Sequence, residues 1–160
     1  MFKILKNTFL VVILGIFISA CSTTAKKSKS ASAGSAGDVY TGTDTVKYLA
    51  TGVADRVFFS TNSTGLTSAA KATLTKQAGY IKASKISVVI EGHADERGTR
   101  EYNLALGERR ANAARDYLMA KGVAKSSIKV ISYGKERPAN TDSSKLAWSQ
   151  NRRSVTVKAK

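Results

Sequence analysis

The chain has 160 residues, which predicts one domain with short appendages. Its single cysteine excludes an intrachain disulfide, and with only one histidine the usual thiolate zinc site is excluded as well. The 26 Lys and Arg residues outnumber the 11 Asp and Glu residues, and the formal net charge of +15 favours anionic partners such as nucleic acid, phospholipid headgroups or an acidic polymer.

The first 20 residues have the layout of a secretory signal peptide. Lys3 and Lys6 form a basic start, residues 8–20 are almost wholly apolar, and small residues precede a possible cleavage site. An uncleaved membrane anchor is the alternative, but the apolar run is shorter than the about 20 residues that cross a bilayer. The pattern therefore favours a cleaved leader over residues 1–20.

The segment Ile18-Ser19-Ala20-Cys21 resembles the bacterial lipobox, although a chance cysteine near a cleavage site would look the same. The resemblance implies that Cys21 is acylated, with palmitate among its chains, and becomes the mature N-terminus. Ser22 stands where an Asp would retain a Gram-negative lipoprotein in the inner membrane. The resemblance therefore implies an outer-membrane anchor, with the rest of the chain facing the periplasm.

Residues 22–43 contain mostly Ser, Ala, Gly, Thr and Lys, without apolar periodicity. Such a segment cannot bury enough surface to offset its ordering entropy, so we expect a flexible linker over residues 21–43. Lys26, Lys27 and Lys29 either rest against anionic headgroups or are simply solvated. A folded domain is expected over residues 44–160.

The first half of this domain predicts a strand, a helix and a second strand. Residues 56–59 (RVFF) read as a short strand. Thr67 is a suitable N-cap for a helix that continues to about Ala83. The β-branched run 86–92 predicts a buried strand. The apolar face of the helix is expected to contain Ala70, Leu74, Ala78 and Ile81.

A second helix is expected after Thr99, another N-cap, and it should stop at Gly122. Strands over 128–134 and 154–159, and a short helix over 144–150, complete the pattern. Alternating strands and helices predict an α/β two-layer sandwich, with helices packed on one face of a mixed sheet. The core stripe of the second helix is expected to contain Leu104, Ala111, Ala114 and Leu118.

The most informative stretch is residues 91–113, which runs from a strand end through a loop into the second helix. Asn103, Leu106, Gly107 and Arg110 fall at i, i+3, i+4 and i+7, so they share one helix face. A glycine inside a helix costs roughly 1 kcal/mol relative to alanine, which indicates a close approach to the backbone at Gly107. Either a ligand or a tightly packed sheet accounts for it.

Asp95 and Arg110 can flank one pocket if the helix folds back over the strand end. A carboxylate beside a guanidinium suits a zwitterion, because the acid accepts from an ammonium and the arginine clamps a carboxylate with two bonds. A structural ion pair between Asp95 and Arg110 is the alternative. The residues alone do not choose between these readings.

The run GHADERGTREYNLALGERRA (92–111) resembles the OmpA-like peptidoglycan-binding domain. SYGKERP (132–138) and NRRSV (151–155) extend the resemblance over roughly residues 50–160. Within this family the chain is most similar to the peptidoglycan-associated lipoproteins of the Tol–Pal system, and the lipobox agrees independently. The fold implied is the OmpA-like two-layer sandwich.

The resemblance implies a ligand, the peptide stem of peptidoglycan, which is bound at meso-diaminopimelate. Asp95 and Arg110 would hold the zwitterionic head of that residue, and Leu106 would line the pocket. Asn103 would brace the loop. Thr61 and Asn62 would add polar contacts, although Ser60 or Asn62 stands where many relatives have an acid. Arg152 and Arg153 match a family motif that either braces the fold or touches partners.

The function implied is a tether that holds the outer membrane to the wall during constriction in cell division, with the β-propeller protein TolB competing for an overlapping face. An OmpA-like lipoprotein unconnected to Tol, and a scaffold without a ligand pocket, are the alternatives. His93, Asp95 and Glu96 are too few for a metal site, and no nucleophile–base pair indicates an enzyme. No cofactor is implied. The predicted leader and the absence of RNP-type motifs disfavour nucleic acid.

Overall fold

The computed structural model describes residues 38–160, so the predicted leader, Cys21 and most of the predicted linker lie outside the described residues. Four strands form the main sheet in the order β3-β6-β4-β5. Strand β4 is parallel to β5 and antiparallel to β6, and β6 is antiparallel to β3. Their bounds are β3 Arg56–Phe58, β4 Val88–His93, β5 Ile128–Gly134 and β6 Arg153–Lys158.

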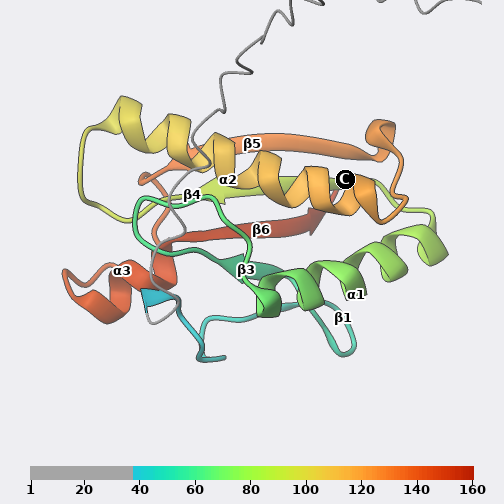
Figure 1. The fold of residues 1–160 in the computed structure, drawn as a ribbon, viewed down its shortest axis with the longest axis horizontal. Helices are drawn as coiled ribbons and strands as arrows, with labels where there is room; N and C mark the ends of the chain where they lie inside the picture. The colour runs from blue at the N-terminus through green and yellow to red at the C-terminus, as the bar shows by residue number, and fades with distance from the viewer. Residues whose placement is uncertain (1–37) are drawn as a thin grey trace, which may run out of the picture.

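The long helices α1 (Ser68–Ser84) and α2 (Arg100–Ala120) pack on one face of this sheet (Figure 1). The core between the layers contains Leu74, Ile90 and Leu118, each at most 1% exposed. The architecture confirms the predicted α/β two-layer sandwich. The remaining elements are β1 Tyr48–Ala50, β2 Val53–Ala54, the 3-10 turn η2 Lys125–Ser127 and α3 Lys145–Asn151. Among residues 38–160, no helix combines the length and apolar character that a membrane span requires.

A side-chain cap begins each of the three α-helices in residues 38–160. The hydroxyl groups of Thr67, Thr99 and Ser144 accept bonds of 3.1, 3.2 and 3.1 Å from backbone N–H groups three residues later. Each cap satisfies a donor that the first helical turn leaves without a partner. The predicted caps at Thr67 and Thr99 are thereby confirmed, and Gly122 follows α2 with φ +85°.

The burial of Leu104 and the start of β4 differ from the sequence-based expectations, and β1 and β2 were not predicted. Leu104 was predicted in the core stripe of α2, but it is 40% exposed, because Asn103, Leu106 and Gly107 form the buried face at this level of the helix. Strand β4 starts at Val88 rather than at residue 86, because the Ile86 N–H donates to the Ile81 carbonyl at the end of α1.

Residues 38–43, which were expected to belong to the flexible linker, contact the domain. The Asp38 carboxylate accepts a 2.7 Å bond from Arg152, and the buried Tyr40 ring packs edge-on against Phe58 at 4.8 Å. The packed part of the chain therefore begins ahead of the expected boundary at residue 44.

Candidate ligand-binding site

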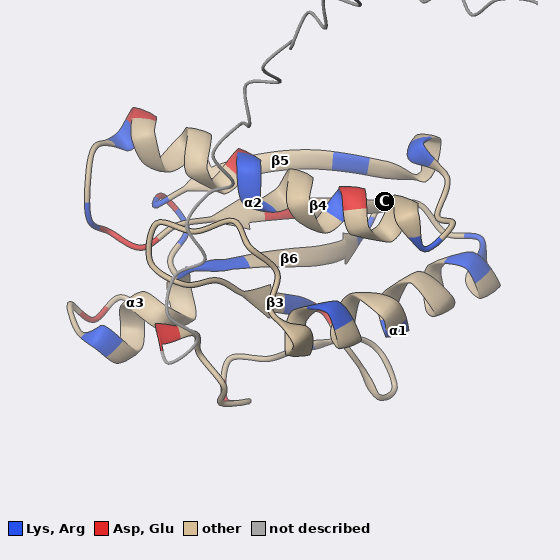
Figure 2. Ribbon diagram, viewed as in Figure 1, with Lys and Arg blue, Asp and Glu red and all other residues tan. Residues whose placement is uncertain are grey.

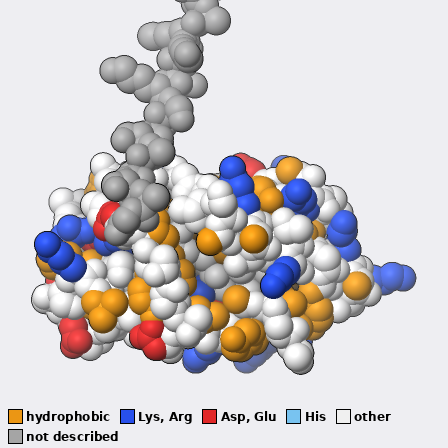
Figure 3. All heavy atoms as spheres, turned by 60° about the horizontal axis from the view of Figure 1, so that its bottom comes forward, with side chains coloured by type: hydrophobic (Ala, Val, Ile, Leu, Met, Phe, Trp, Pro, Cys, Tyr) orange, Lys and Arg blue, Asp and Glu red, His pale blue; other side chains and the backbone are white. Residues whose placement is uncertain are grey.

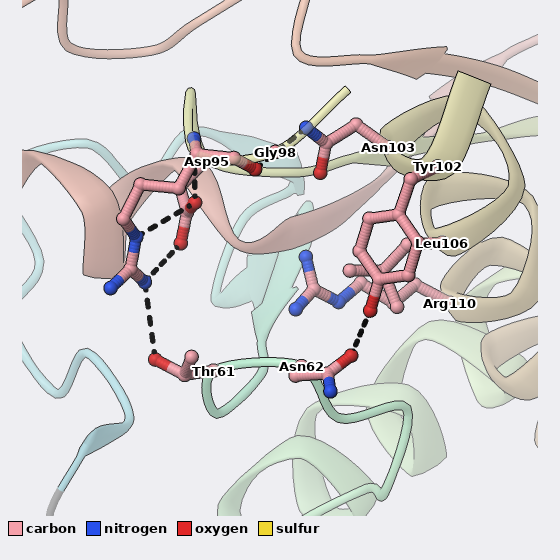
Figure 4. A pocket seen from close by; sticks show the side chains of 9 residues that line it. Thr61, Asn62, Asp95, Gly98, Tyr102, Asn103, Leu106 and Arg110 are labelled. Atoms are coloured by element: carbon pink, nitrogen blue, oxygen red, sulfur yellow. Dashed lines mark hydrogen bonds and ion pairs between the residues drawn. The ribbon is translucent and has the colours of Figure 1, made fainter. Parts of the chain in front are cut away.

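A pocket of about 260 Å³ opens where the end of β4, the start of α2 and the loop after β3 meet (Figure 4). Loops at strand ends are common positions for binding groups, because they are held by a rigid scaffold while facing solvent. All six residues predicted to bind a ligand line this pocket. The lining consists of Thr61, Asn62, Asp95, Arg97, Gly98, Tyr102, Asn103, Leu106 and Arg110.

Helix α2 supplies one wall of the pocket through Asn103, Leu106 and Arg110, which share one helix face as their spacing predicted and are all buried. The Asn103 side chain donates a 2.8 Å bond to the Arg97 carbonyl. This bond ties the loop after β4 to the first turn of α2, and it agrees with the bracing position that the resemblance implied for Asn103.

Gly107 lies on the same face of α2, and the close approach of the sheet explains why a glycine stands there. A Cβ at Gly107 would lie 2.5 Å from the Ser132 hydroxyl and 2.9 Å from the Gly92 carbonyl oxygen, both on strands of the sheet. Such distances require the helix to move away from the sheet. Of the two readings left open by the sequence, close helix–sheet packing is therefore the one observed.

Arg110 forms the floor of the pocket and is completely buried. Its Nε, Nη1 and Nη2 donate to the carbonyls of Ser63, His93 and Ser60 at 3.0, 2.9 and 3.1 Å. These bonds join the loop after β3 to the end of β4. Burial, and next the charge of Arg152, lowers the Arg110 pKa to about 10, so the side chain stays charged at neutral pH.

The Asp95 carboxylate is held by two arginines. Arg97 donates from Nε to Oδ1 at 3.1 Å and from Nη2 to Oδ2 at 2.6 Å, and Arg152 Nη1 lies 3.3 Å from Oδ2. Burial raises the Asp95 pKa. The hydrogen bonds and charge of Arg97 and the hydrogen bond from Arg152 lower this pKa by more, so the net shift is downward. Asp95 is therefore an anion at neutral pH.

The structure shows no ion pair between Asp95 and Arg110, so the structural ion pair considered from the sequence is wrong. Asp95 takes Arg97 and Arg152 as its partners, whereas Arg110 donates to backbone carbonyls. The reason is geometric: three carbonyls converge on the Arg110 guanidinium, and Arg97 lies only two residues from Asp95. Both charges nevertheless border the same pocket (Figure 4).

Thr61 and Asn62 form the opposite wall, from the loop after β3. The Thr61 hydroxyl accepts a 3.3 Å bond from Arg97 Nη2, and the Asn62 side-chain carbonyl accepts from the Tyr102 hydroxyl. Asn62 adopts a left-handed backbone conformation with φ +50°, which asparagine tolerates better than most residues. The Asn62–Tyr102 bond closes the pocket between the loop and α2.

Arg152 connects the pocket with the start of the described chain. It is buried and donates to the Phe59 carbonyl at 3.1 Å, to Asp95, and to the carbonyl and carboxylate of Asp38 at 2.6 and 2.7 Å. Asp38 in turn accepts a 2.6 Å bond from the Thr61 N–H. Of the two roles that the sequence left open for Arg152, these buried bonds within the domain favour bracing the fold over contact with a partner.

His93 and Glu96, which precede and follow Asp95 closely in sequence, do not line the pocket. The His93 ring stacks against Tyr133 at 5.6 Å, and burial together with the charges of Arg153, Arg56 and Arg137 lowers its pKa to about 3. The Glu96 carboxylate accepts from the Trp148 indole at 2.7 Å and from Ser143. Within the described part of the chain, no three His, Cys, Asp or Glu side chains converge as metal ligands do.

Arg97, Gly98 and Tyr102 also line the pocket, although they were not predicted from the sequence. Arg97 and Gly98 belong to the quoted motif, and Tyr102 directly precedes Asn103 on α2, so proximity to predicted residues was the available signal. Arg97 also lies over the Trp148 ring, with its guanidinium carbon 4.4 Å from the ring centroid. Trp148 comes from α3, 51 positions later in the chain, and nothing local in the sequence indicates that pairing.

A sequence model of the OmpA family matches residues 58–152, which contain the loop after β3, the whole of α2 and Arg152. The chain belongs to the OmpA family.

Relatives of this OmpA-family chain include two proteins named peptidoglycan-associated lipoprotein. That of Mesorhizobium japonicum is 57% identical over 106 residues, which cover 66% of this chain and 63% of the relative. That of Rhizobium meliloti is 56% identical, with 66% and 60% covered. The chain thus matches less than two thirds of the length of these relatives.

Solved structures give the same result. The peptidoglycan-associated lipoprotein from Burkholderia pseudomallei aligns with a TM-score of 0.64 at 38% identity, covering 66% of this chain and 90% of that one. This similarity confirms the OmpA-like fold and the resemblance to peptidoglycan-associated lipoproteins. Membership of the OmpA family also supports a binding protein and not an enzyme.

Proposed function

We propose that this OmpA-family chain anchors a membrane to the cell wall by binding peptidoglycan non-covalently in the Asp95/Arg110 pocket. The observation that carries the proposal is the convergence of all six predicted residues on one pocket with both charge signs at its border. The names of the relatives, peptidoglycan-associated lipoprotein, support the same ligand.

The ligand that best fits this chemistry is the free end of meso-diaminopimelate, which carries an ammonium and a carboxylate on one carbon. Asp95 accepts from the ammonium. Three of the five Arg110 N–H groups are donated to protein carbonyls, which leaves one on each terminal nitrogen for the carboxylate. Figure 4 shows the Arg110 guanidinium directed into the space between Asp95 and Asn62.

Leu106, Tyr102 and Asn103 complete the pocket from α2, where Leu106 supplies an apolar surface for the aliphatic part of the ligand. Arg97 must yield part of its hold on Asp95 when an ammonium arrives. Its side chain is 42% exposed and therefore has room to turn. After it turns, the Arg97 guanidinium still faces the ligand carboxylate. Arg97 therefore exchanges the Asp95 carboxylate for that of the ligand.

The test is calorimetric titration of the full-length chain in detergent with a diaminopimelate-containing muropeptide. A matched muropeptide with lysine in place of diaminopimelate lacks the terminal carboxylate. The variant is Asp95→Asn, which removes the negative charge and nearly preserves shape. The control is Glu101→Gln, because Glu101 is an exposed acid in the first turn of α2 that does not line the pocket.

We expect the parent and Glu101→Gln to bind the diaminopimelate muropeptide equally. Asp95→Asn should bind at least about tenfold more weakly, because truncation of one partner in a desolvated charge pair costs about 2 kcal/mol or more. The lysine muropeptide should also bind more weakly. Equal affinity of Asp95→Asn and the parent, in samples that remain folded by circular dichroism, would refute this pocket as the site.

The finer parts of this proposal rest on the lipobox and the family resemblance of the sequence. Cys21 carries the lipid, the outer membrane holds it, and the domain faces the periplasm. TolB binds an overlapping face, which makes the chain part of the Tol–Pal system during constriction. Muropeptide that displaces TolB from the full-length chain would support this assignment, whereas simultaneous binding of both would contradict it.

Two alternatives from the sequence lead to different results. A scaffold without a ligand pocket should show Asp95 buried against Arg110, whereas these residues border a cavity of about 260 Å³. An OmpA-like lipoprotein unconnected to Tol would bind the muropeptide but not TolB. The competition experiment separates that alternative from the Tol–Pal assignment.

A further inference from the structure

One end of the domain gathers the termini of five elements. Strand β4 begins there, and its first residue, Val88, is aligned with Ile128 at the start of β5 and with Lys158 at the end of β6. Helices α1 and α2 end there, and the Lys82 ammonium at the end of α1 donates a 2.9 Å bond to the Lys121 carbonyl after α2. In Figure 1 this end lies at the right, and the start of α2 and the end of β4, which border the pocket, lie toward the opposite end.

Seven exposed lysines lie at this end, which we call the lysine end. The stretches that build it, residues 79–85, 117–129 and 157–160, contain no Asp or Glu. The nearest acid along α2 is Asp116, which is paired with Arg115 at 2.8 Å. Figure 2 shows basic residues along the ribbon there, and the right-hand tip in Figure 3 carries basic side chains and no acidic one. The lysine end consists of Lys82, Lys85, Lys121, Lys125, Lys129, Lys158 and Lys160.

The two ends of the domain use different cations. The pocket end holds Arg97, Arg110 and Arg152, whose planar forks bind carboxylates and carbonyls in defined geometry. The lysine end carries compact, strongly hydrated charges on flexible stems, and none of its seven lysines lines the pocket. Such a surface is suited to a diffuse layer of negative charge and not to one shaped ligand.

Nucleic acid fits the lysine end less well than a lipid surface does. Single-stranded nucleic acids stack their bases on exposed aromatic rings. The two tyrosines at this end, Tyr80 and Tyr117, are instead partly buried and lie under lysines. Lys158 and Lys121 have their ammonium nitrogens 5.4 Å from the respective ring centroids.

We propose that the lysine end docks on anionic phospholipid headgroups of the membrane that carries the chain's own lipid anchor. The inference goes beyond wall binding, and it rests on the proposed acylation of Cys21. With the lysine end on the membrane, the pocket at the other end of the domain faces away from that membrane and toward the wall.

The length of the tether permits this orientation. Helix α2 has 21 residues and spans about 30 Å between the two ends. The described chain starts at Asp38, beside the pocket, and residues 22–37 between Cys21 and Asp38 span at most about 55 Å. The tether is therefore long enough to run the length of the domain while the lysine end touches the headgroups.

The test uses the full-length chain in vesicles of phosphatidylcholine alone or mixed with phosphatidylglycerol. Because acylation consumes the only native cysteine, an introduced cysteine gives a single dye position. Ser126→Cys places the dye at the lysine end, and Thr141→Cys places it near the pocket end. Energy transfer to acceptor dyes on headgroups reports which end approaches the membrane.

Two charge variants are compared in both dye backgrounds, each losing four exposed positive charges by substitution with glutamine. The control set lies outside the lysine end, so net charge is matched. The lysine-end variant changes Lys85, Lys121, Lys125 and Lys129. The control variant changes Lys71, Lys76, Arg109 and Lys145.

With phosphatidylglycerol present, we expect transfer from the Ser126→Cys dye to rise at least about twofold over neutral vesicles, since each lysine near an anionic surface contributes roughly a fivefold factor. The lysine-end variant should lose this rise, the control should keep it, and high salt should abolish it. Equal transfer in both vesicle types, or equal loss in both variants, would overturn the proposal. So would a soluble polyanion that occupies the lysine end while anionic vesicles do not.

Failure of the anchor is distinguishable from failure of the docking. An acylated chain floats with neutral vesicles, whereas an unacylated one does not. If the chain is not acylated, docking is measured as flotation with anionic vesicles. Loss of that flotation in the lysine-end variant alone would still support docking by the lysine end. Titration with muropeptide tests the pocket separately, so the two inferences fail independently.

Discussion

Replacement of Arg110 by alanine is expected to lower the free energy of unfolding by about 3 kcal/mol, although the residue lines a binding pocket. Its guanidinium donates to three buried carbonyls, those of Ser60, Ser63 and His93, at 2.9 to 3.1 Å. A hydrogen bond from a charged donor contributes about 1.5 to 3 kcal/mol, so the loss of three such bonds costs about 6 kcal/mol.

Burial of the charge opposes this loss. The pKa of Arg110 is lowered to about 10 from an ordinary value of 12.5, which corresponds to about 3 kcal/mol of destabilisation that alanine removes. The cost of the three lost hydrogen bonds, less the gain from removing the buried charge, gives the expected loss of about 3 kcal/mol. Arg110→Lys should recover less than half of the loss, because a single ammonium cannot reach three carbonyls that surround a planar fork.

The assay is urea denaturation followed by far-UV circular dichroism at neutral pH. The control is Arg109→Ala, because Arg109 is the exposed neighbour on the same helix and its removal should change stability by no more than about 0.5 kcal/mol. An Arg110→Ala protein within about 1 kcal/mol of the parent would refute the reasoning, since surface substitutions already vary by half that amount. A destabilised Arg110→Ala also means that lost ligand binding by this variant would not identify the pocket, which is why Asp95→Asn is the better test.

Two further predictions concern His93 and Trp148. Burial and the charge of Arg153 lower the pKa of His93 to about 3, whereas the unfolded chain takes up this proton near pH 6.5; the free energy of unfolding should therefore fall as pH drops from about 6.5 to 3, by roughly 4 kcal/mol over that window. Urea titrations at stepped pH should show this slope in the parent and a shallower one in His93→Gln, and equal slopes would contradict the assignment. Trp148 is the only tryptophan and lies under Arg97, so a muropeptide that draws Arg97 away from Asp95 should change its emission. The same titration of Asp95→Asn should leave the emission unchanged, and an unchanged spectrum at saturation of the parent would show that Arg97 stays in place.

The sequence was sufficient for local structure where short-range chemistry decides it. Thr67 and Thr99 satisfy the first N–H groups of their helices whatever the rest of the chain does, and the run of residues 128–134 forms strand β5 with the predicted bounds. The shared helix face of Asn103, Leu106 and Arg110 follows from helical geometry alone. The family resemblance then indicated that Thr61 and Asn62, in the loop after β3, belong to the same site.

Only the tertiary structure decided the partners of each charge. Asp95 and Arg110 look complementary in the sequence, but Arg110 meets three carbonyls and Asp95 meets Arg97 and Arg152. Leu104 has the spacing of a core residue, yet the close approach of Gly107 to the sheet turns the helix so that Leu104 is 40% exposed. Pairings between distant segments depend on packing that no local pattern encodes.

The lysine end illustrates the same distinction. The sequence determines an excess of positive charge but not its location. Three stretches far apart in the chain, which end at Lys85, Lys129 and Lys160, are brought together only because α1, α2 and β6 end where β4 and β5 begin. The sequence by itself therefore determined the four strands of the main sheet, the helices, the caps at Thr67 and Thr99 and the family motif. The topology of the sheet decided which charges face each other and which collect at one end.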